Sequence, residues 1–280
     1  MTNISLTGLL LRQLIFGERV TRIVEAIEER IKVARKAARD MRPASRCPRQ
    51  RQIAIVRIVT MLIDLHAHTW PRSHDSVLNP DDLIVRAKQS GLDAIVFTEH
   101  DTVWDYKSIE ELRAKHDFLV LAGVEISTDD GHILAFGIDK YVFGMHRSRE
   151  LAGYTEKAEG ALVAAHPYRR QMPWFSRNDE EYRAALEKAS RNPAYQYVQG
   201  LEEVNGRGSD KENEFSRKLC EMMELKGTGG TDSHAISDVG KCATYFEVEI
   251  HDERELIAEL KSGRFHAVDM RSGQPVASRA

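Results

Sequence analysis

The chain has 280 residues, which is enough for one large α/β domain or two modest ones. Its hydrophobic content of 42% and charged content of 30% are globular values, and a net charge of −3 does not require a nucleic-acid partner. Cys47, Cys220 and Cys242 lack C-x-x-C spacing, which indicates neither a thiolate zinc site nor a disulfide framework and fits a reducing, cytoplasmic compartment. No apolar run approaches the roughly 18–20 residues of a membrane helix.

The first 60 residues differ from the rest of the chain in charge. They carry 13 Lys or Arg and five Asp or Glu, a net charge of +8, so the remainder carries −11. Apolar residues at helical spacing predict an amphipathic helix over 18–41, and a basic linker follows over 42–52. Three interpretations of this helical extension stay open: a basic arm for nucleic acid or another anionic surface, a helix packed on the body, and non-native sequence ahead of a start at Met61.

After the extension, short apolar runs alternate with helical patterns. Asn79 before Pro80 marks a helix start, Gly91 marks its end, and Ser108 with Glu111 predicts a capping box for the next helix. Alternating strands and helices predict βαβ units, a parallel sheet and, from about seven repeats, a barrel. The expected helices cover 79–91, 108–116, 179–190, 210–227 and 253–263; the expected strands cover 61–68, 92–100, 118–128, 131–139, 161–167, 198–205, 227–234, 241–250 and 264–270; the barrel domain covers 61–270 and a disordered tail 271–280.

Polar side chains gather where the expected strands end. His66 and His68 are two residues apart, so in a strand their imidazoles share one face. In a parallel barrel the carboxyl ends of the strands meet at one mouth, where active sites are built. Nitrogen and carboxylate ligands without cysteine suit Zn²⁺, Mn²⁺ or Fe²⁺, and their number predicts two or three divalent ions. The polar residues at strand ends are His66, His68, Glu99, His100, Asp101, Glu125, His166, Asp232 and His234.

Each of these residues taken alone also has a purely structural interpretation. His66 and His68 could form a hydrogen-bonded pair at a strand end, and Glu125 could be the partner of a buried cation. His100, Asp232 and His234 could cap helices. The metal hypothesis fails only if all of these structural interpretations hold at once. Such residues occur at five strand ends, and this coincidence makes a purely structural explanation of all of them improbable.

The motifs "DLHAHT", "FTEHDT", "GVEIS", "AAHPY" and "GGTDSH" resemble, in this order, the PHP family, the polymerase and histidinol phosphatase domain. The resemblance covers about residues 62–268. It implies a distorted, TIM-like seven-stranded βα barrel, two or three divalent metals and phosphoester hydrolysis. It also implies that Glu125 bridges metals. The positions that match family ligands are His66, His68, His100, Glu125, His166, Asp232 and His234.

Three positions stay open in this resemblance. The loop after "HAH" supplies one ligand, for which spacing favours His74 and leaves Asp75 as the rival. His132 resembles a ligand of a third metal or is a hydrogen-bond donor to Glu125. Glu99, where family members often have Asp, either orients a metal histidine or contacts the site directly.

The expected chemistry is attack of a metal-activated water on phosphorus. His66, His68, Glu125 and Asp232 would hold one ion; His74 or Asp75, with His100 and His234, a second; and His166, Glu125 and His132 a third. The candidates for protonating the leaving oxygen are Asp101 and His234. The candidate phosphate-binding cations are Arg169, Arg170 and Lys241, whose alternative is ordinary surface charge.

The substrate expected from these features is a small phosphate ester, a nucleotide or an oligonucleotide. The Arg- and aromatic-rich loop 169–182 could stack a base or simply pack on the barrel. Histidinol phosphate is a specific alternative. A metal-dependent amidohydrolase is a second one, although no lysine suited to a carboxylated bridge follows a strand. A non-catalytic module with a structural metal is a third, and the number of ligands opposes it. A nucleic acid is a compatible but not a required partner, and no membrane is expected.

Overall fold

The computed structural model describes residues 60–172 and 179–271. The predicted helical extension and the predicted tail lie outside these residues, apart from Thr60 and Arg271, and so does the middle of the loop 169–182. Within the described ranges, no helix is long and apolar enough to cross a membrane.

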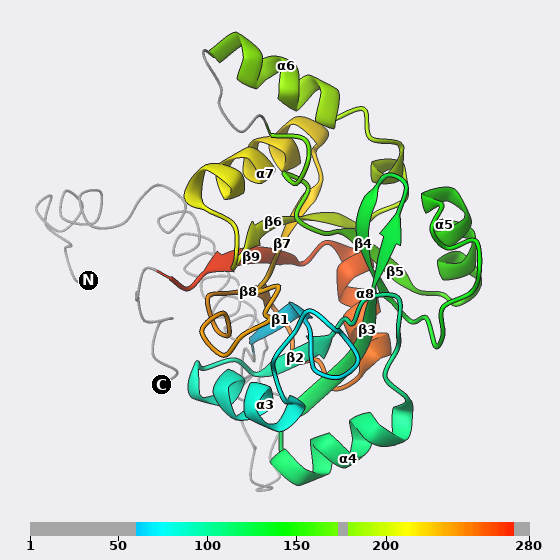
Figure 1. The fold of residues 1–280 in the computed structure, drawn as a ribbon, viewed down its shortest axis with the longest axis vertical. Helices are drawn as coiled ribbons and strands as arrows, with labels where there is room; N and C mark the ends of the chain where they lie inside the picture. Colours follow the sequence, from blue (N-terminus) through cyan, green and yellow to red (C-terminus); the bar gives the residue numbers. More distant parts are fainter. Residues whose placement is uncertain (1–59, 173–178, 272–280) are drawn as a thin grey trace, which may run out of the picture. The chain divides into compact units, whose positions relative to one another are not determined.

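Within the described residues, nine strands form one sheet in the order β7-β6-β5-β4-β3-β2-β1-β8-β9, and helices lie around it (Figure 1). The barrel-like α/β class is therefore confirmed, whereas the seven-strand count implied by the family resemblance is wrong for this chain. β4 runs antiparallel to β3 and β5, and β8 is antiparallel to β1 and β9. The strands are β1 (Met61–Ala67), β2 (Ala94–Phe97), β3 (Leu119–Thr128), β4 (Gly131–Phe136), β5 (Ala161–Ala164), β6 (Gly200–Asn205), β7 (Lys226–Gly230), β8 (Cys242–Phe246) and β9 (Phe265–Asp269).

Local signals explain most helix boundaries. Asn79 caps the first helix after β1 by accepting the Asp81 amide, as predicted. The predicted capping box at Ser108 is wrong, because Asp105 is the N-cap and accepts the Ser108 amide. One helix, α5, was not predicted, and its N-cap Arg147 makes no side-chain capping bond that would signal it. The helices are α3 (Pro80–Gln89), α4 (Tyr106–His116), α5 (Ser148–Lys157), α6 (Asp179–Ala189), the 3₁₀ turn η1 (Pro193–Gln196), α7 (Asp210–Met223) and α8 (Glu253–Ser262).

The sheet closes where β7 meets β1 and β8. The buried Asp64 carboxylate in β1 accepts hydrogen bonds from the Thr231 amide and hydroxyl, just after β7. Gly229 in β7 donates its amide to the Thr244 hydroxyl of β8 at 2.9 Å. A Cβ at Gly229 would lie 2.2 Å from the Ala243 carbonyl oxygen. The glycine-rich sequence of β7 therefore permits a backbone approach that side chains would block.

The barrel has an apolar interior below the strand ends that carry the polar residues. Ile63 and Leu65 of β1 belong to a buried cluster with residues of β2, β3, β4, β5, β8 and β9. Leu256 and Ile257 of α8 pack in the same cluster. Two further clusters lie between the sheet and the other helices, one against α3 and α4 and one against α5, α6 and α7. This packing gives the strand ends a rigid base.

An irregularity in β1 changes which face its last residues present. Leu62 and Ala67 both belong to the cluster against α3 and α4, although strict alternation over five positions would separate them. The β1–β2 register shifts between Asp64 and Ala67. Such a bulge re-aims the side chains that follow it. His66 and His68 thereby join the face of the barrel interior rather than the face of the helices.

Candidate metal centre

The structure brings together the strand-end residues that the sequence predicted. Their ligand atoms form four overlapping groups of three in which all atoms lie within 4.8 Å of one another. The groups share His66, His68, His100 and Glu125, so they make one continuous centre rather than separate sites. The groups are His66–His68–Asp232, His68–His100–His234, His66–Glu125–His166 and His100–Glu125–His132.

Glu125 of β3 lies at the middle of this centre and is fully buried. Its Oε1 atom accepts hydrogen bonds from His132 Nδ1 at 2.8 Å and His166 Nε2 at 2.9 Å. Its Oε2 atom lies 3.3 Å from His66 Nε2 and 3.2 Å from His68 Nε2. Burial opposes ionisation of this carboxyl, but the surrounding imidazoles outweigh burial and hold its pKa well below its usual range.

Asp232 supplies the second buried carboxylate. Its Oδ1 atom lies 3.6 Å from His66 Nε2 and 3.5 Å from His68 Nε2, and its Oδ2 atom accepts a hydrogen bond from Arg169. Burial raises the pKa of Asp232, yet the charges of His66 and Arg169 and the contact with His68 lower it far more. The residue is therefore an anion that faces the same two imidazole nitrogens as Glu125.

Two groups orient the paired histidines from behind. His66 Nδ1 donates to Glu202 Oε1 at 2.9 Å, and the other oxygen of Glu202 accepts from Asn205 and from the His166 amide. His68 Nδ1 lies 3.2 Å from the Ser73 hydroxyl, which in turn donates to Glu99. Because both Nδ1 atoms are engaged, both Nε2 atoms direct their lone pairs at the centre.

The loop after β1 carries the two rival ligands, His74 and Asp75. Asp75 Oδ2 lies 3.3 Å from His100 Nε2 and 3.1 Å from His234 Nε2. His74 is exposed and its ring meets Trp70 edge-on, and neither His74 nor Asp75 belongs to a candidate metal group found in the described part of the chain. The structure places Asp75, rather than the favoured His74, beside His100 and His234, and which of the two binds a metal stays a prediction.

Other predicted residues have clear positions. Glu99 is buried and accepts hydrogen bonds from Ser73, Thr69 and Trp104, so it acts through Ser73 and outside the metal groups. Asp101 accepts the Ser127 amide with its Oδ1 atom. Lys241 pairs at 2.9 Å with Asp238, whose carboxylate accepts the His234 amide, so it supports the loop of His234.

Backbone strain is concentrated at the same place. Seven described non-glycine residues have positive φ, and three of them (Asp117, Glu159 and Glu224) are at or just after helix ends, where left-handed residues are common. The other four have no such explanation. Strained backbone of this kind persists where surrounding structure over-determines it, as functional sites do. These four residues are Asp101, His166, Arg170 and Asp232.

The donor set fits divalent cations. Among the described residues, four buried side-chain polar atoms lack a hydrogen bond, and two of these are Glu125 Oε2 and Asp232 Oδ1. Both face the Nε2 atoms of His66 and His68, which are 3.0 Å apart. Two buried anionic oxygens opposite two nitrogens need a positive charge between them. Burial lowers the pKa of His66, but the nearby carboxylates raise it well above its ordinary value.

Sequence reasoning missed Glu202 and Asn205. Both lie in β6 near its carboxyl end, which is the criterion that selected the other site residues. The register between β6 and β7 shifts between Glu202 and Val204, so alternation along β6 does not reveal which carboxylate faces the centre. A Cβ at Gly230 would lie 2.5 Å from both Glu202 Oε1 and His66 Cβ. The glycine before "TDSH" is thus a signal that a close contact follows.

Comparison with known proteins adds family evidence at one end of the chain. A family model described as PHP-associated matches residues 210–265. An uncharacterized protein of Methanocaldococcus jannaschii is 26% identical over 117 residues, which cover 39% of this chain and 68% of that protein. A 5′-3′ exoribonuclease of Haemophilus influenzae is 33% identical over 86 residues, covering 29% of this chain and 31% of the enzyme.

The fold also has a solved counterpart. A two-domain protein of Bacteroides vulgatus, with a part described as a PHP-like metal-dependent phosphoesterase, superposes with a TM-score of 0.54 at 21% identity. The match covers 75% of this chain and 65% of that chain. At 21% identity it shows that the two proteins share a fold. The match over 210–265 and the five ordered motifs are both similar to the PHP family, and the fold is shared with this solved protein.

Proposed function

We propose that this protein is a metal-dependent phosphoesterase. The observation that carries the proposal is the pair of buried oxygens, Glu125 Oε2 and Asp232 Oδ1, that accept no hydrogen bond and face two imidazole nitrogens. Divalent ions bound there would lower the pKa of a coordinated water and polarise a phosphoryl oxygen. The names of the exoribonuclease and of the PHP-like phosphoesterase among the similar proteins point in the same direction.

Other residues of the chain would orient the metal ligands, bind the phosphoryl group and protonate the leaving oxygen. Glu202 and Ser73 orient His66 and His68 so that no reorganisation is needed when a substrate arrives. Arg169 is 40% exposed while one of its nitrogens bonds Asp232, so its guanidinium is in place to contact a phosphoryl oxygen at the edge of the centre. Either Asp101 or His234 would protonate the leaving oxygen.

Nucleotides or short oligonucleotides are the substrates we propose first, with small monoesters such as histidinol phosphate as the narrower alternative. A panel of phosphomonoesters, phosphodiesters and amides tests the proposal after metal analysis of the purified protein, with Mn²⁺, Zn²⁺ and Fe²⁺ supplied separately. We expect bound metal and hydrolysis of phosphoesters. Amide hydrolysis without phosphoester hydrolysis would overturn the proposal and support an amidohydrolase.

A further inference from the structure

Three buried histidines of the metal centre differ in the group that faces their Nδ1 atom. His66 Nδ1 faces the Glu202 carboxylate at 2.9 Å, and His234 Nδ1 faces a backbone carbonyl oxygen at 2.8 Å. Both groups can only accept a hydrogen bond, so they place a ring proton on Nδ1 and leave the Nε2 lone pair for a metal. His68 is different, because its Nδ1 faces the hydroxyl of Ser73, which can either donate or accept.

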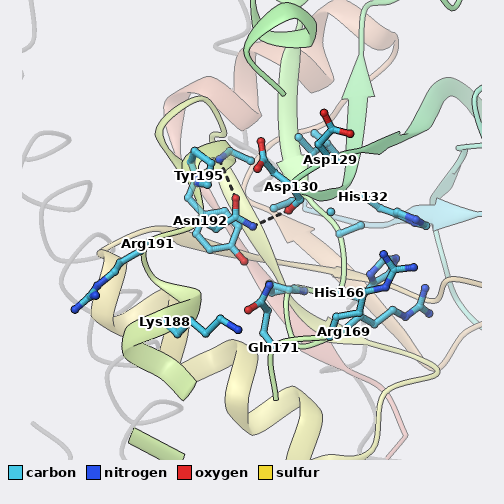
Figure 2. Close-up of a pocket in the computed structure, with 18 residues that line it drawn as sticks. Asp129, Asp130, His132, His166, Arg169, Gln171, Lys188, Arg191, Asn192 and Tyr195 are labelled. Atoms are coloured by element: carbon cyan, nitrogen blue, oxygen red, sulfur yellow. Dashed lines mark hydrogen bonds between the residues drawn. The ribbon is translucent and has the colours of Figure 1, made fainter. Parts of the chain in front are cut away.

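Burial separates His68 from the histidines that solvent can reach. Figure 2 shows His132 and His166 at the wall of a cavity of about 400 Å³, where water can hydrogen-bond to ring nitrogens. His68 is fully buried, and Ser73 and Glu99 are at most 1% exposed. The direction of the hydrogen bond between His68 and Ser73 is therefore set by the protein.

Ser73 uses its full hydrogen-bonding capacity. Its Oγ atom lies 3.2 Å from His68 Nδ1, accepts the His100 amide at 3.3 Å and donates to Glu99 Oε2. A hydroxyl has one proton to donate and two lone pairs that accept. Because the proton goes to Glu99, His68 must donate its own Nδ1 proton to Ser73. Glu99 thereby decides the direction of the hydrogen bond to His68.

Fixed donors hold the Glu99 carboxylate in this orientation. Its Oε1 atom accepts the Trp104 indole N–H at 2.9 Å and the Thr69 hydroxyl, and its Oε2 atom accepts the Thr69 amide at 2.9 Å. An indole and a backbone amide can only donate. The Trp104 ring is itself held, because the Arg72 guanidinium lies 4.1 Å from its centroid. Oε1 is thus committed to Trp104, and Oε2 is the oxygen that faces Ser73.

We propose that Glu99 is a positioning residue that fixes the ring tautomer of His68. The carboxylate accepts the Ser73 proton, Ser73 accepts the Nδ1 proton of His68, and His68 Nε2 keeps the lone pair that a metal needs. An amide in place of the carboxylate would reverse this relay, because its nitrogen would donate to Ser73 and the hydroxyl proton would turn toward His68 Nδ1. The inference rests on the metal binding in the proposed function, whatever the substrate is.

Glu99→Gln tests the relay directly. Trp104 keeps the amide oxygen at the Oε1 position, where the Thr69 amide can also donate at 3.1 Å, so the amide nitrogen faces Ser73. Nitrogen-15 NMR of the histidine rings, with His68 assigned by its loss in His68→Ala, reports whether Nδ1 carries a proton. In chelator-treated protein we expect a protonated His68 Nδ1 in the wild type and an unprotonated one in Glu99→Gln.

Zinc affinity, measured by competition with a chelator, gives a second readout. Zinc binding through His68 Nε2 requires the proton on Nδ1, which the reversed relay opposes, so Glu99→Gln should bind Zn²⁺ about 10- to 100-fold more weakly. An unprotonated Nδ1 in the wild type would overturn the inference even if the variant fails to fold. An unchanged Nδ1 or an unchanged zinc affinity in a folded Glu99→Gln variant would overturn it too.

Glu253→Gln is the matched control. It makes the same change at the start of α8, where Glu253 Oε1 accepts from Arg113 at 2.7 Å and from the Ala122 amide at 3.2 Å, outside the candidate metal groups of the described residues. An amide oxygen can accept both bonds, so the His68 spectrum and the zinc affinity should match those of the wild type. Equal losses of zinc affinity in Glu253→Gln and Glu99→Gln would contradict a specific relay.

Ser73→Ala tests the route by which Glu99 acts. This variant removes the hydroxyl between Glu99 and His68, so adding Glu99→Gln to it should weaken zinc binding no further. Additive losses in the double variant would show that Glu99 acts by another route and would overturn the inference. If the NMR and zinc results are as expected and no phosphoester is hydrolysed, the proposed function fails and the role of Glu99 stands.

Discussion

The metal centre has a buried half and an exposed half. His66, His68, Glu125 and Asp232 are at most 1% exposed. Asp75, His100 and His132 have side chains that are 57%, 28% and 31% exposed. In the buried half, each histidine is held by a group outside the candidate ligands, Glu202 or Ser73. In the exposed half, the side-chain contacts described for these residues are almost entirely with other candidate ligands.

This difference indicates that the two halves of the centre have different roles, one preformed and one adjustable. The buried half is set by the bulge in β1 and by the contacts behind its histidines, so its geometry exists before an ion binds. The exposed half can adjust when ions or substrate arrive, because few contacts with the body restrain it. Substitutions in the buried half should therefore cost far more activity than conservative changes in the exposed half.

The largest effect is expected from Glu125→Ala. This change removes the carboxylate that contacts five histidines of the centre. We expect loss of bound metal and a fall in phosphoesterase activity of more than about a thousandfold. Elemental analysis and initial rates check it, and circular dichroism confirms that the variant folds. If the variant retains its bound metal and its phosphoesterase activity, the buried half does not bind the metal.

A smaller but still large effect is expected from Gly230→Ala. The added Cβ would lie 2.5 Å from His66 Cβ and from Glu202 Oε1, so the buried half must shift. Overpacking of this kind costs about 1–3 kcal/mol of stability, and a displaced ligand costs about a hundredfold in rate.

The control for this substitution is Gly153→Ala in α5. A Cβ at Gly153 meets nothing within 4 Å. Alanine is favoured over glycine in a helix by about 0.5–1 kcal/mol, so this variant should be equally or more stable and fully active. Thermal unfolding and initial rates compare the two variants. Similar behaviour of both would argue against tight packing behind His66.

Glu202→Gln should have an intermediate effect. It retains the shape of the side chain but weakens the acceptor that holds His66 Nδ1, and such changes cost about 10- to 100-fold in metal affinity or activity. Metal titration of chelator-treated protein measures this loss. Glu203→Gln is the matched control, because the neighbouring Glu203 pairs with Arg217 away from the centre. Equal metal affinity in both variants would contradict an orienting role for Glu202.

The smallest effects are expected in the loop of the exposed half. Asp75→Asn should lower activity by about tenfold, since it weakens one exposed ligand among several. His74→Ala should stay within about twofold of the native protein, as is usual for an exposed residue. Initial rates at saturating metal measure both, and the reverse order would restore His74 as the ligand.

The same comparison explains what the sequence could predict. His66, His68, His166 and Asp232 follow from one local rule, that polar residues at parallel strand ends meet at a barrel mouth. The choice between His74 and Asp75 depends on how the loop folds back. Ser76 donates its hydroxyl to the His68 carbonyl, and this tertiary contact has no local sequence signal.

Features that depend on strand register could not be predicted from the sequence either. Register shifts in β1 and β6 decide that His66 and Glu202 face each other across the barrel. The four antiparallel pairings of the described strands, all made by β4 or β8, could not be predicted, because strand periodicity does not reveal strand direction. Helix α5 was missed because its start carries no capping side chain.

Hydrolysis of p-nitrophenyl phosphate and its diester, followed while Mn²⁺ or Zn²⁺ is titrated into chelator-treated protein, tests the central claim most directly. The wild-type protein should be inactive without the cation and regain activity as the cation binds. The double variant His66→Ala, His68→Ala should stay inactive at every concentration, because it lacks two ligands of the buried half. Full activity in metal-free wild-type protein, or in the double variant, would contradict a metal-dependent phosphoesterase built on these residues.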